Sequence, residues 1–244
     1  MDFSCDEIVC INLVERADKR LLFDDMMRKQ GISFTYFDAI RDKKIPSRGC
    51  FMSHAKVISD AYEKGVKRLM IFEDDSVILE NIENSVILQI NSFLDDEKWE
   101  IFSLSGTPFI WNSTIKKHPK YENIYKGNYT NASAYILNTC AIEKYSKLKW
   151  EFGTKIIDKD VYMKNQNAYC IFPKLYNQRM IKNDITYVGS KYIMIFIYLR
   201  EFFDSLEIKY ALTINIEVWK VIFASVIFFS ICFSVIFRRK LVSI

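Results

Sequence analysis

The chain has 244 residues, of which 50% are hydrophobic, 15% aromatic and 26% charged, with only 7 glycines and 4 prolines. This composition excludes a mainly disordered, collagen-like or low-complexity chain and allows one sizeable domain with a buried core. The net charge of +4 comes largely from residues 213–244, so the first 212 residues are nearly neutral and predict no nucleic-acid surface.

Short apolar runs alternate with helical patterns over the first 180 residues, which predicts an α/β fold. In chain order, the patterns predict strands at residues 8–13, 33–37, 69–72, 101–104, 134–137 and 168–172, and helices at residues 18–30, 50–64 and 141–148. Gly31 and Gly65 stand where glycines that end helices belong. Residues 106–127 lack a regular pattern and predict a long loop of the kind that often carries substrate contacts.

The C-terminal region has a different character. Residues 221–237 contain no charge and are followed by Arg238, Arg239 and Lys240. At ~1.5 Å per residue this core is about 26 Å long, and counting from Ile214 extends it across a hydrocarbon layer of about 30 Å. We therefore expect an aromatic amphipathic juxtamembrane segment at 186–213, a single transmembrane helix at 214–237 and a basic tail at 238–244.

The topology of this anchor rests on two conflicting signals. The basic tail favours a cytoplasmic C-terminus, whereas a late anchor without an N-terminal signal normally leaves the main domain in the cytosol. We expect a cytosolic rather than a lumenal domain; a lumenal one would make Asn112, Asn128 and Asn131 glycosylation candidates. Ser230 and Ser234 are a weak signal that two anchors pair in a homodimer.

Several kinds of site have little support in the sequence. The six cysteines form no C-x-x-C pair and accompany only two histidines, which argues against a zinc site or a disulfide framework. Cys50 and His54 could form a thiol and base pair, but no oxyanion element accompanies them, so nucleophilic catalysis is not expected. The widely spaced glycines exclude G-x-G-x-x-G and P-loop nucleotide sites.

The most informative feature is the acidic triplet Glu73, Asp74 and Asp75, which directly follows the buried strand predicted at residues 69–72. Open α/β sheets bind ligands at the carboxyl ends of their strands, and carboxylates suit Mg²⁺ or Mn²⁺, which can clamp a diphosphate. If strand geometry continues, Glu73 and Asp75 point to one side and Asp74 to the other. The alternative is a solvated acidic turn, but the two other Asp-Asp pairs do not follow a buried strand. The triplet is therefore predicted to bind a metal or a nucleotide.

Segments of the chain, in order, resemble glycosyltransferase family 25, which includes bacterial lipooligosaccharide and collagen galactosyltransferases. The matching segments are INLVERADKR (11–20), FDAI (37–40), GCFMSH (49–54), IFEDDS (71–76), ASAYILNTCAIEKY (132–145), IIDKD (156–160) and YNQRMIKNDI (176–185). The resemblance implies a GT-A-like nucleotide-diphospho-sugar transferase fold over residues 1–185. It also implies a UDP-sugar donor, usually UDP-galactose or UDP-glucose, and inverting transfer to a hydroxyl of a glycan, glycolipid or glycoprotein acceptor.

The resemblance also suggests roles for individual residues. Asp75 is the expected principal ligand of Mn²⁺ or Mg²⁺, with Glu73 as a second ligand, and Glu73 or Asp74 would contact the donor ribose or a metal-bound water. The donor-binding candidates are Asn12, Arg16, Arg20, His54, Glu73 and Asp74. Arg16 and Arg20 share one helical face and could pair with a diphosphate or a carboxylate, or be ordinary surface residues.

An inverting transfer needs a base near the acceptor hydroxyl, and Asp158 and Asp160 are the candidates. Asp158 matches the family pattern better, although either residue could instead cap the following segment. Thr139-Cys140 and Asn183 depart from the family pattern. These departures keep a second hypothesis open, a catalytically degenerate, tail-anchored binding or adaptor protein on the same fold.

Overall fold

A computed structural model of the chain describes residues 2–79, 82–108, 116–127, 129–151, 157, 164–179 and 225. The base candidates Asp158 and Asp160 lie outside the described residues. So do the expected juxtamembrane, transmembrane and tail segments, apart from Ser225. Within the described residues, no helix is both long and apolar enough to cross a membrane.

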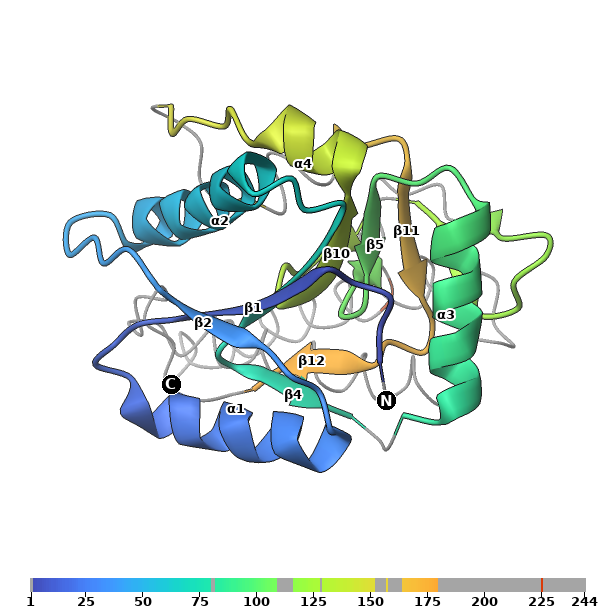
Figure 1. The fold of residues 1–244 in the computed structure, drawn as a ribbon, viewed down its shortest axis with the longest axis horizontal. Coiled ribbons are helices and arrows are strands. Elements are labelled where there is room, and N and C mark those ends of the chain that lie inside the picture. The colour runs from blue at the N-terminus through green and yellow to red at the C-terminus, as the bar shows by residue number, and fades with distance from the viewer. Residues whose placement is uncertain are drawn as a thin grey trace, which may run out of the picture.

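A mixed sheet forms the centre of the described part (Figure 1). Its eight strands are, in spatial order, β2 (Thr35–Asp38), β1 (Glu7–Asn12), β3 (Arg68–Glu73), β10 (Ala134–Asn138), β5 (Ile101–Ser103), β11 (Ala168–Ile171), β8 (Ile124–Lys126) and β7 (Lys116–Lys117). β1 is parallel to β2 and β3, and β5 is parallel to β11, whereas β10 runs antiparallel between β3 and β5. Two small sheets accompany it: β4 (Ser76–Ile78) pairs with β12 (Tyr176–Gln178), and β6 (Thr107–Pro108) pairs with β9 (Tyr129–Thr130).

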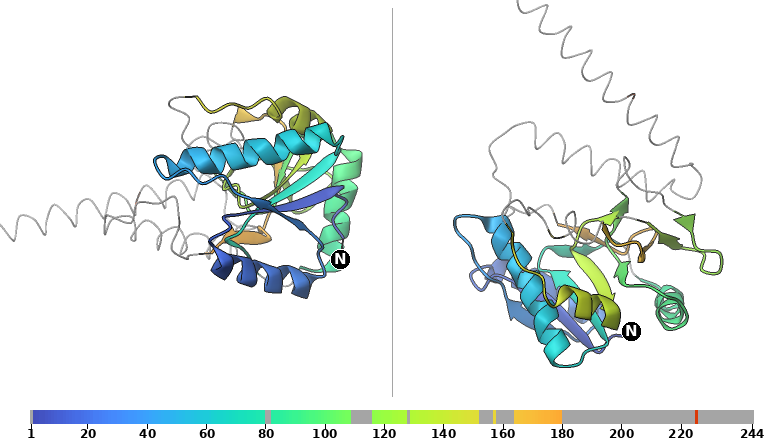
Figure 2. Two further views of the ribbon diagram at one scale, coloured as in Figure 1. Left: turned by 60° about the vertical axis from the view of Figure 1, so that its left-hand side comes forward. Right: turned by 90° about the horizontal axis from the view of Figure 1, so that it is seen from above.

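Helices cover both faces of this sheet, as Figures 1 and 2 show. α1 (Ala17–Gln30) and α3 (Asn84–Asp96) lie on one face, and α2 (Pro46–Glu63) and α4 (Thr139–Tyr145) on the other. Successive residues of β3 serve the two layers in turn, because side chains alternate along a strand. Met70 and Phe72 pack with α1 and α3, whereas Leu69 and Ile71 pack with α2 and α4. The predicted α/β class is confirmed.

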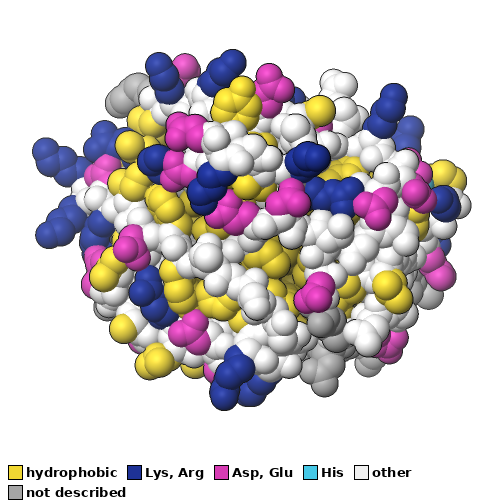
Figure 3. Space-filling model, in the orientation of Figure 1, with side chains coloured by type: hydrophobic (Ala, Val, Ile, Leu, Met, Phe, Trp, Pro, Cys, Tyr) yellow, Lys and Arg dark blue, Asp and Glu magenta, His cyan; other side chains and the backbone are white. Residues whose placement is uncertain are grey.

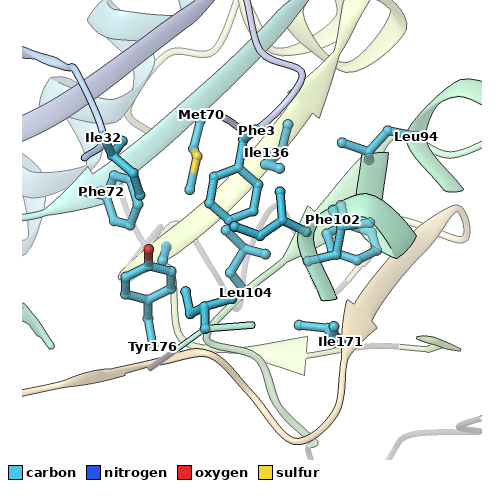
Figure 4. Packing of buried hydrophobic residues seen from close by; sticks show 14 of the residues in the cluster. Phe3, Ile32, Met70, Phe72, Leu94, Phe102, Leu104, Ile136, Ile171 and Tyr176 are labelled. Atoms are coloured by element: carbon cyan, nitrogen blue, oxygen red, sulfur yellow. The ribbon is translucent and has the colours of Figure 1, made fainter. Parts of the chain in front are cut away.

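The layer that contains α1 and α3 has an aromatic core (Figure 4). Phe72 meets Phe23 of α1 edge to face at 5.5 Å between ring centroids, and Tyr176 of β12 at 5.0 Å. Each such pair contributes about 0.5–1.5 kcal/mol to stability beyond the contribution from burial of the two rings. This packing holds β12 beneath the carboxyl end of β3, so the residues that follow Tyr176 reach the acidic triplet.

The element boundaries correct the sequence prediction at two places. α2 begins at Pro46, four residues before the predicted start, because proline suits the first turn of a helix and Gly49 is helical rather than part of a loop. Residues 106–127, predicted to be a loop, include the short strands β6, β7 and β8. The two predicted helix-ending glycines are confirmed, since Gly31 and Gly65 have φ values of +67° and +73°.

The surface of the described part carries both signs of charge. On the face in Figure 3, acidic and basic side chains are interspersed, with hydrophobic side chains visible between them. This pattern agrees with the small net charge of the first 212 residues.

Candidate active site

A cavity of about 220 Å³ opens where β1 and β3 end. Its walls come from the end of β1, from residues 39–43 after β2, from the first half of α2 and from the acidic triplet, with Lys19 of α1 and Gln178 of β12. Because the three walls from β1, β2 and β3 meet at the carboxyl ends of parallel strands, the cavity lies where open α/β sheets bind their ligands.

The acidic triplet is divided between two sets of partners. β3 ends at Glu73, and Asp74 and Asp75 form a turn before β4, so the alternation expected of a continuing strand is wrong. Glu73 contacts α2 through His54. Asp74 and Asp75 both approach the ammonium of Lys19, with Nζ–O distances of 2.9 and 3.6 Å.

Lys19 is a site residue that the sequence analysis missed. Its side chain is only 5% exposed. Burial alone would lower the pKa of Lys19, but the charges of Asp75 and Asp74 raise it above its usual value, so the ammonium stays protonated. The sequence does hold a signal that Lys19 is buried, because Lys19 shares the helical face of the buried residues Phe23 and Met26, with spacing i, i+4 and i+7.

Asp75 is buried and incompletely hydrogen-bonded. Gln178 Nε2 donates to its Oδ2 at 3.2 Å, but its buried Oδ1 accepts no hydrogen bond from any residue that the structure describes. Burial raises the pKa of Asp75 to about 7, and the neighbouring charges of Glu73 and Asp74 add to the increase while Lys19 opposes it. An unsatisfied buried carboxylate oxygen of this kind fits a divalent cation such as Mn²⁺ or Mg²⁺.

The raised pKa of Asp75 also determines how this carboxyl affects folding. An unfolded aspartate loses its proton near a pKa of about 3.9, whereas the folded protein holds the proton up to about pH 7. The folded state therefore binds the proton more tightly than the unfolded state. In the absence of a bound cation, this carboxyl opposes folding increasingly as the pH rises from about 4 to about 7.

Two predicted donor residues support Asp74. Asn12 is buried, and its Nδ2 donates to Asp74 Oδ2 at 2.8 Å. Arg20 Nε donates to Asn12 Oδ1 at 3.0 Å, and the same guanidinium pairs with Asp38. Neither Asn12 nor Arg20 lines the cavity, and their contacts hold Asp74 in position, Asn12 directly and Arg20 through Asn12. Their role in donor binding stays a prediction.

Arg16 is placed differently from Arg20. Its guanidinium makes two contacts of 2.9 Å with Asp18, two residues along the chain, and it does not line the cavity. Both guanidiniums thus pair with carboxylates, Arg16 with Asp18 and Arg20 with Asp38, and a role for either arginine in donor binding stays a prediction.

The segment GCFMSH fixes α2 against the loop after β2. Gly49 packs so closely that a Cβ there would lie 2.4 Å from the carbonyl oxygen of Ile40. Ser53 Oγ accepts a hydrogen bond from the Ile40 N–H at 2.8 Å and donates to the Gly49 carbonyl at 2.8 Å. Glycine and serine are thus required by this contact, and Ser53 is a second residue that the sequence analysis left without a role.

The remaining polar residues of GCFMSH turn toward Glu73. His54 is fully buried, with Nε2 3.2 Å from Glu73 Oε1 and Nδ1 2.7 Å from the Tyr135 hydroxyl. Cys50 Sγ lies 3.7 Å from the same carboxylate oxygen. Burial alone would raise the pKa of Glu73, but the hydrogen bond and charge of His54 lower it below its usual value.

The outer wall of the cavity carries basic side chains from the segment RDKK, residues 41–44. Arg41 and Lys43 are exposed and line the cavity, and Arg41 pairs with Glu15 at 2.6 Å. Between them, Asp42 anchors the loop by accepting from the N–H groups of Lys44 and Ile45, each at 2.9 Å. Neither basic residue was among the predicted donor-binding residues, because the run resembles an ordinary solvated loop.

A cavity with carboxylates at the carboxyl edge of an α/β sheet and cations at its rim is typical of sites that bind an anionic, metal-binding ligand such as a nucleotide diphosphate. Residues 46–182, more than half of the chain, match the family described as "Glycosyltransferase family 25 (LPS biosynthesis protein)". The chain therefore belongs to glycosyltransferase family 25, which confirms the resemblance. The matching segments at residues 11–20 and 37–40 precede the matched range.

Curated relatives agree with this assignment. The chain is 27% identical over 109 residues to the lacto-N-neotetraose biosynthesis glycosyltransferases LgtB of Neisseria meningitidis and LgtE of Neisseria gonorrhoeae. The match covers 36% of this chain and 37% of LgtB and 36% of LgtE, so it spans little more than a third of either relative.

Solved structures that partly resemble this chain include a glycosyltransferase involved in glycosylation of the major capsid of PBCV-1, with a TM-score of 0.46 and 12% identity over 72% of this chain and 93% of that chain. Another is a Drosophila β-1,4-galactosyltransferase 7 mutant in complex with manganese, UDP-Gal and xylobiose. It has a TM-score of 0.41 and 11% identity over 77% of this chain and 78% of that chain. These similarities are weak, and the family assignment rests on the family match.

Proposed function

We propose that this chain is an inverting glycosyltransferase of GT-A-like fold that moves a hexose, galactose or glucose, from a UDP-sugar to an acceptor hydroxyl. Family membership supports the transfer. The observation that carries the proposal is the buried Asp75 Oδ1, which accepts no hydrogen bond from any described residue, in a cavity at the carboxyl edge of the sheet. The names of the Neisseria relatives support a glycan, glycolipid or related acceptor.

Asp75 and Asp74 are the residues that would hold Mn²⁺ or Mg²⁺, since their carboxylates converge beside Lys19 and the buried Asp75 Oδ1 accepts no hydrogen bond from any described residue. Glu73, the second ligand suggested by the resemblance, is instead engaged by His54 and Cys50. When bound, the ion would neutralise negative charge on the UDP leaving group.

The protein's own side chains would bind and orient the donor. Lys19 balances the charge of Asp74 and Asp75, while Arg41 and Lys43 place two cations on the outer wall, where they can contact the diphosphate. Asp158 or Asp160 would take the proton of the acceptor hydroxyl, as the family resemblance suggests.

The test is sugar transfer and donor hydrolysis by the full-length protein against a panel of UDP-sugars, with and without Mn²⁺. We expect metal-dependent turnover with one donor, and a loss of at least about 100-fold in kcat/KM for Asp75→Asn. Asp25→Asn is the matched control, because Asp25 lies on the exposed side of α1 beside Arg28 and Lys29. Turnover by Asp75→Asn at the wild-type rate with intact metal dependence would refute the assignment.

The adaptor hypothesis predicts a different result. Calorimetry with UDP, in the presence and absence of Mn²⁺, should show metal-coupled nucleotide binding for an enzyme and none for a binding protein that has lost the site. A protein that is folded by circular dichroism, but shows neither turnover with any UDP-sugar nor metal-coupled binding of UDP, would favour the adaptor hypothesis.

We also propose that residues 214–237 anchor the chain in a membrane with its domain on the cytosolic side, motivated by the charge-free run and the basic tail. The test is protease digestion of intact vesicles that carry the full-length chain. Protection of the domain until detergent is added would contradict the topology, and release of the protein by carbonate would contradict the anchor. Cross-linking of cysteines placed at Ser230 or Ser234 tests the proposed pairing of anchors.

A further inference from the structure

Three side chains of different chemistry converge on one point of the cavity wall. Cys50 Sγ, His54 Nε2 and a carboxylate oxygen of Glu73 all lie within 4.8 Å of one another. The sequence predicts no zinc site, because its six cysteines form no C-x-x-C pair and accompany only two histidines. The fold supplies what the spacing could not show, since Cys50 and His54 lie one turn apart on α2 and Glu73 comes from the end of β3.

The spacing of these atoms resembles that of ligands around one ion. With bonds of about 2.3 Å to sulfur and about 2.0–2.1 Å to nitrogen and oxygen, tetrahedral zinc separates a nitrogen from an oxygen ligand by about 3.3 Å, and a sulfur from an oxygen ligand by about 3.5 Å. The observed separations are 3.2 Å from His54 Nε2 to Glu73 Oε1 and 3.7 Å from Cys50 Sγ to the same oxygen. Only small side-chain movements would therefore be needed to bind such an ion.

The surroundings also suit a metal centre. His54 Nδ1 is 2.7 Å from the Tyr135 hydroxyl, which can hold the proton on Nδ1 and leave Nε2 to bind the ion. All three ligand residues line the cavity, so the ion can enter and a fourth position can face the bound ligand.

We propose that Cys50, His54 and Glu73 form a binding site for a zinc-class divalent cation, separate from the Asp75 metal and with one coordination position open to the cavity. A thiolate and an imidazole favour Zn²⁺ or Co²⁺ over Mg²⁺ and Mn²⁺, which prefer sets of oxygen ligands such as Asp74 and Asp75. The proposal does not depend on the sugar-transfer activity.

The test is titration of the full-length protein, stripped of metal and kept reduced with a phosphine, with Co²⁺ as a spectroscopic probe. One equivalent should produce a thiolate-to-cobalt charge-transfer band and the visible bands of a four-coordinate ion, and Zn²⁺ should displace it. Cys50→Ser should abolish the charge-transfer band and weaken Zn²⁺ binding at least about 100-fold, whereas Tyr135→Phe should weaken it about tenfold or more. Cys140→Ser is the matched control, because Cys140 is exposed and distant in sequence from the cluster.

A second measurement covers the case in which Cys50→Ser does not fold. In the wild-type protein, one equivalent of Zn²⁺ should slow alkylation of Cys50 but not of Cys140, as read by mass spectrometry of the cysteine peptides. Cobalt binding without a sulfur band, a band that persists in Cys50→Ser, or equal alkylation rates with and without Zn²⁺ would each overturn the proposal. Asp75→Asn separates the two sites, since it should abolish Mn²⁺ binding and leave the cobalt band unchanged.

Discussion

Gly49 provides a direct test of how the site is built. It lies in the first turn of α2, where replacement of glycine by alanine normally stabilises a helix by about 0.5–1 kcal/mol. An added Cβ would lie 2.4 Å from the Ile40 carbonyl oxygen and 2.9 Å from the Asp42 nitrogen, whereas ordinary contact begins at 3.4 Å. Both neighbours are backbone atoms, and the Ser53 hydrogen bond ties this loop to the helix, so the helix and the loop must separate by roughly 1 Å.

Overpacking of this kind costs about 1–3 kcal/mol, which exceeds the gain in helix propensity. We therefore expect Gly49→Ala to lower the free energy of unfolding in urea by roughly 1–2 kcal/mol. Because the displaced turn carries Cys50, Ser53 and His54, we also expect kcat/KM for sugar transfer to fall by up to about 100-fold.

Gly65→Ala is the control for this experiment. Gly65 has open space around its Cα but a φ of +73°, so alanine there should cost about 1–2 kcal/mol through backbone strain alone. This variant should lose stability without losing activity. A Gly49→Ala protein that is as stable and as active as the wild type would show that α2 and the loop do not pack as described.

Three further changes test the polar contacts of the site. Lys19→Met should lower the free energy of unfolding at pH 8 by about 3 kcal/mol, because it leaves buried carboxylates without their ammonium, whereas the exposed Lys29→Met should change little in the same urea titration. In metal-free protein, Asp75→Asn should be more stable than the wild type, and its advantage in the free energy of unfolding should be roughly 2–3 kcal/mol larger at pH 8 than at pH 5. The reason is that only the wild type must ionise a buried carboxyl of pKa about 7. An equal advantage at both pH values would contradict this prediction. Ser53→Ala should lower the free energy of unfolding by about 1–2 kcal/mol and speed hydrogen exchange of the Ile40 amide, which loses its acceptor. Unchanged exchange of this amide would argue against the hydrogen bond.

The strands at the centre of the sheet, such as β1, β3 and β10, could be predicted because each is a short and largely buried apolar run, whereas β7 and β8 at the sheet edge are too short and polar to give that signal. β1, β3 and β10 lie within one or two residues of their predicted positions. The predicted start of α2 is four residues too late because Pro46 and Gly49 are residue types typical of loops. Only the tertiary contact with residues 40–42 explains a glycine inside the helix. The buried residues of α3 have helical spacing, so the sequence holds a signal for that helix that the predicted set of elements lacks.

The location of the site was predictable, but its internal contacts were not. A buried strand that ends in three carboxylates indicates a ligand site from local sequence alone. The partners of these carboxylates are distant in the chain: Lys19 lies 55 residues before Asp74, and Gln178 lies 103 residues after Asp75. No local periodicity encodes such pairs, because they depend on how α1 and β12 pack against the sheet.

The division of the acidic triplet leads to one further prediction about metal binding. Lys19 stabilises Asp74 and Asp75 in the folded protein, yet its positive charge repels a divalent cation at the same carboxylates. Removal of this charge in Lys19→Met should therefore tighten Mn²⁺ binding by about tenfold or more while the metal-free protein becomes less stable. Electron paramagnetic resonance measures the change in Mn²⁺ affinity, because its signal reports the free Mn²⁺ during a titration without urea. Tighter Mn²⁺ binding together with lower stability would show that the ammonium and the ion compete for the two carboxylates. A fall in both Mn²⁺ affinity and stability would contradict the prediction and mean that Lys19 mainly holds the carboxylates in position for the ion.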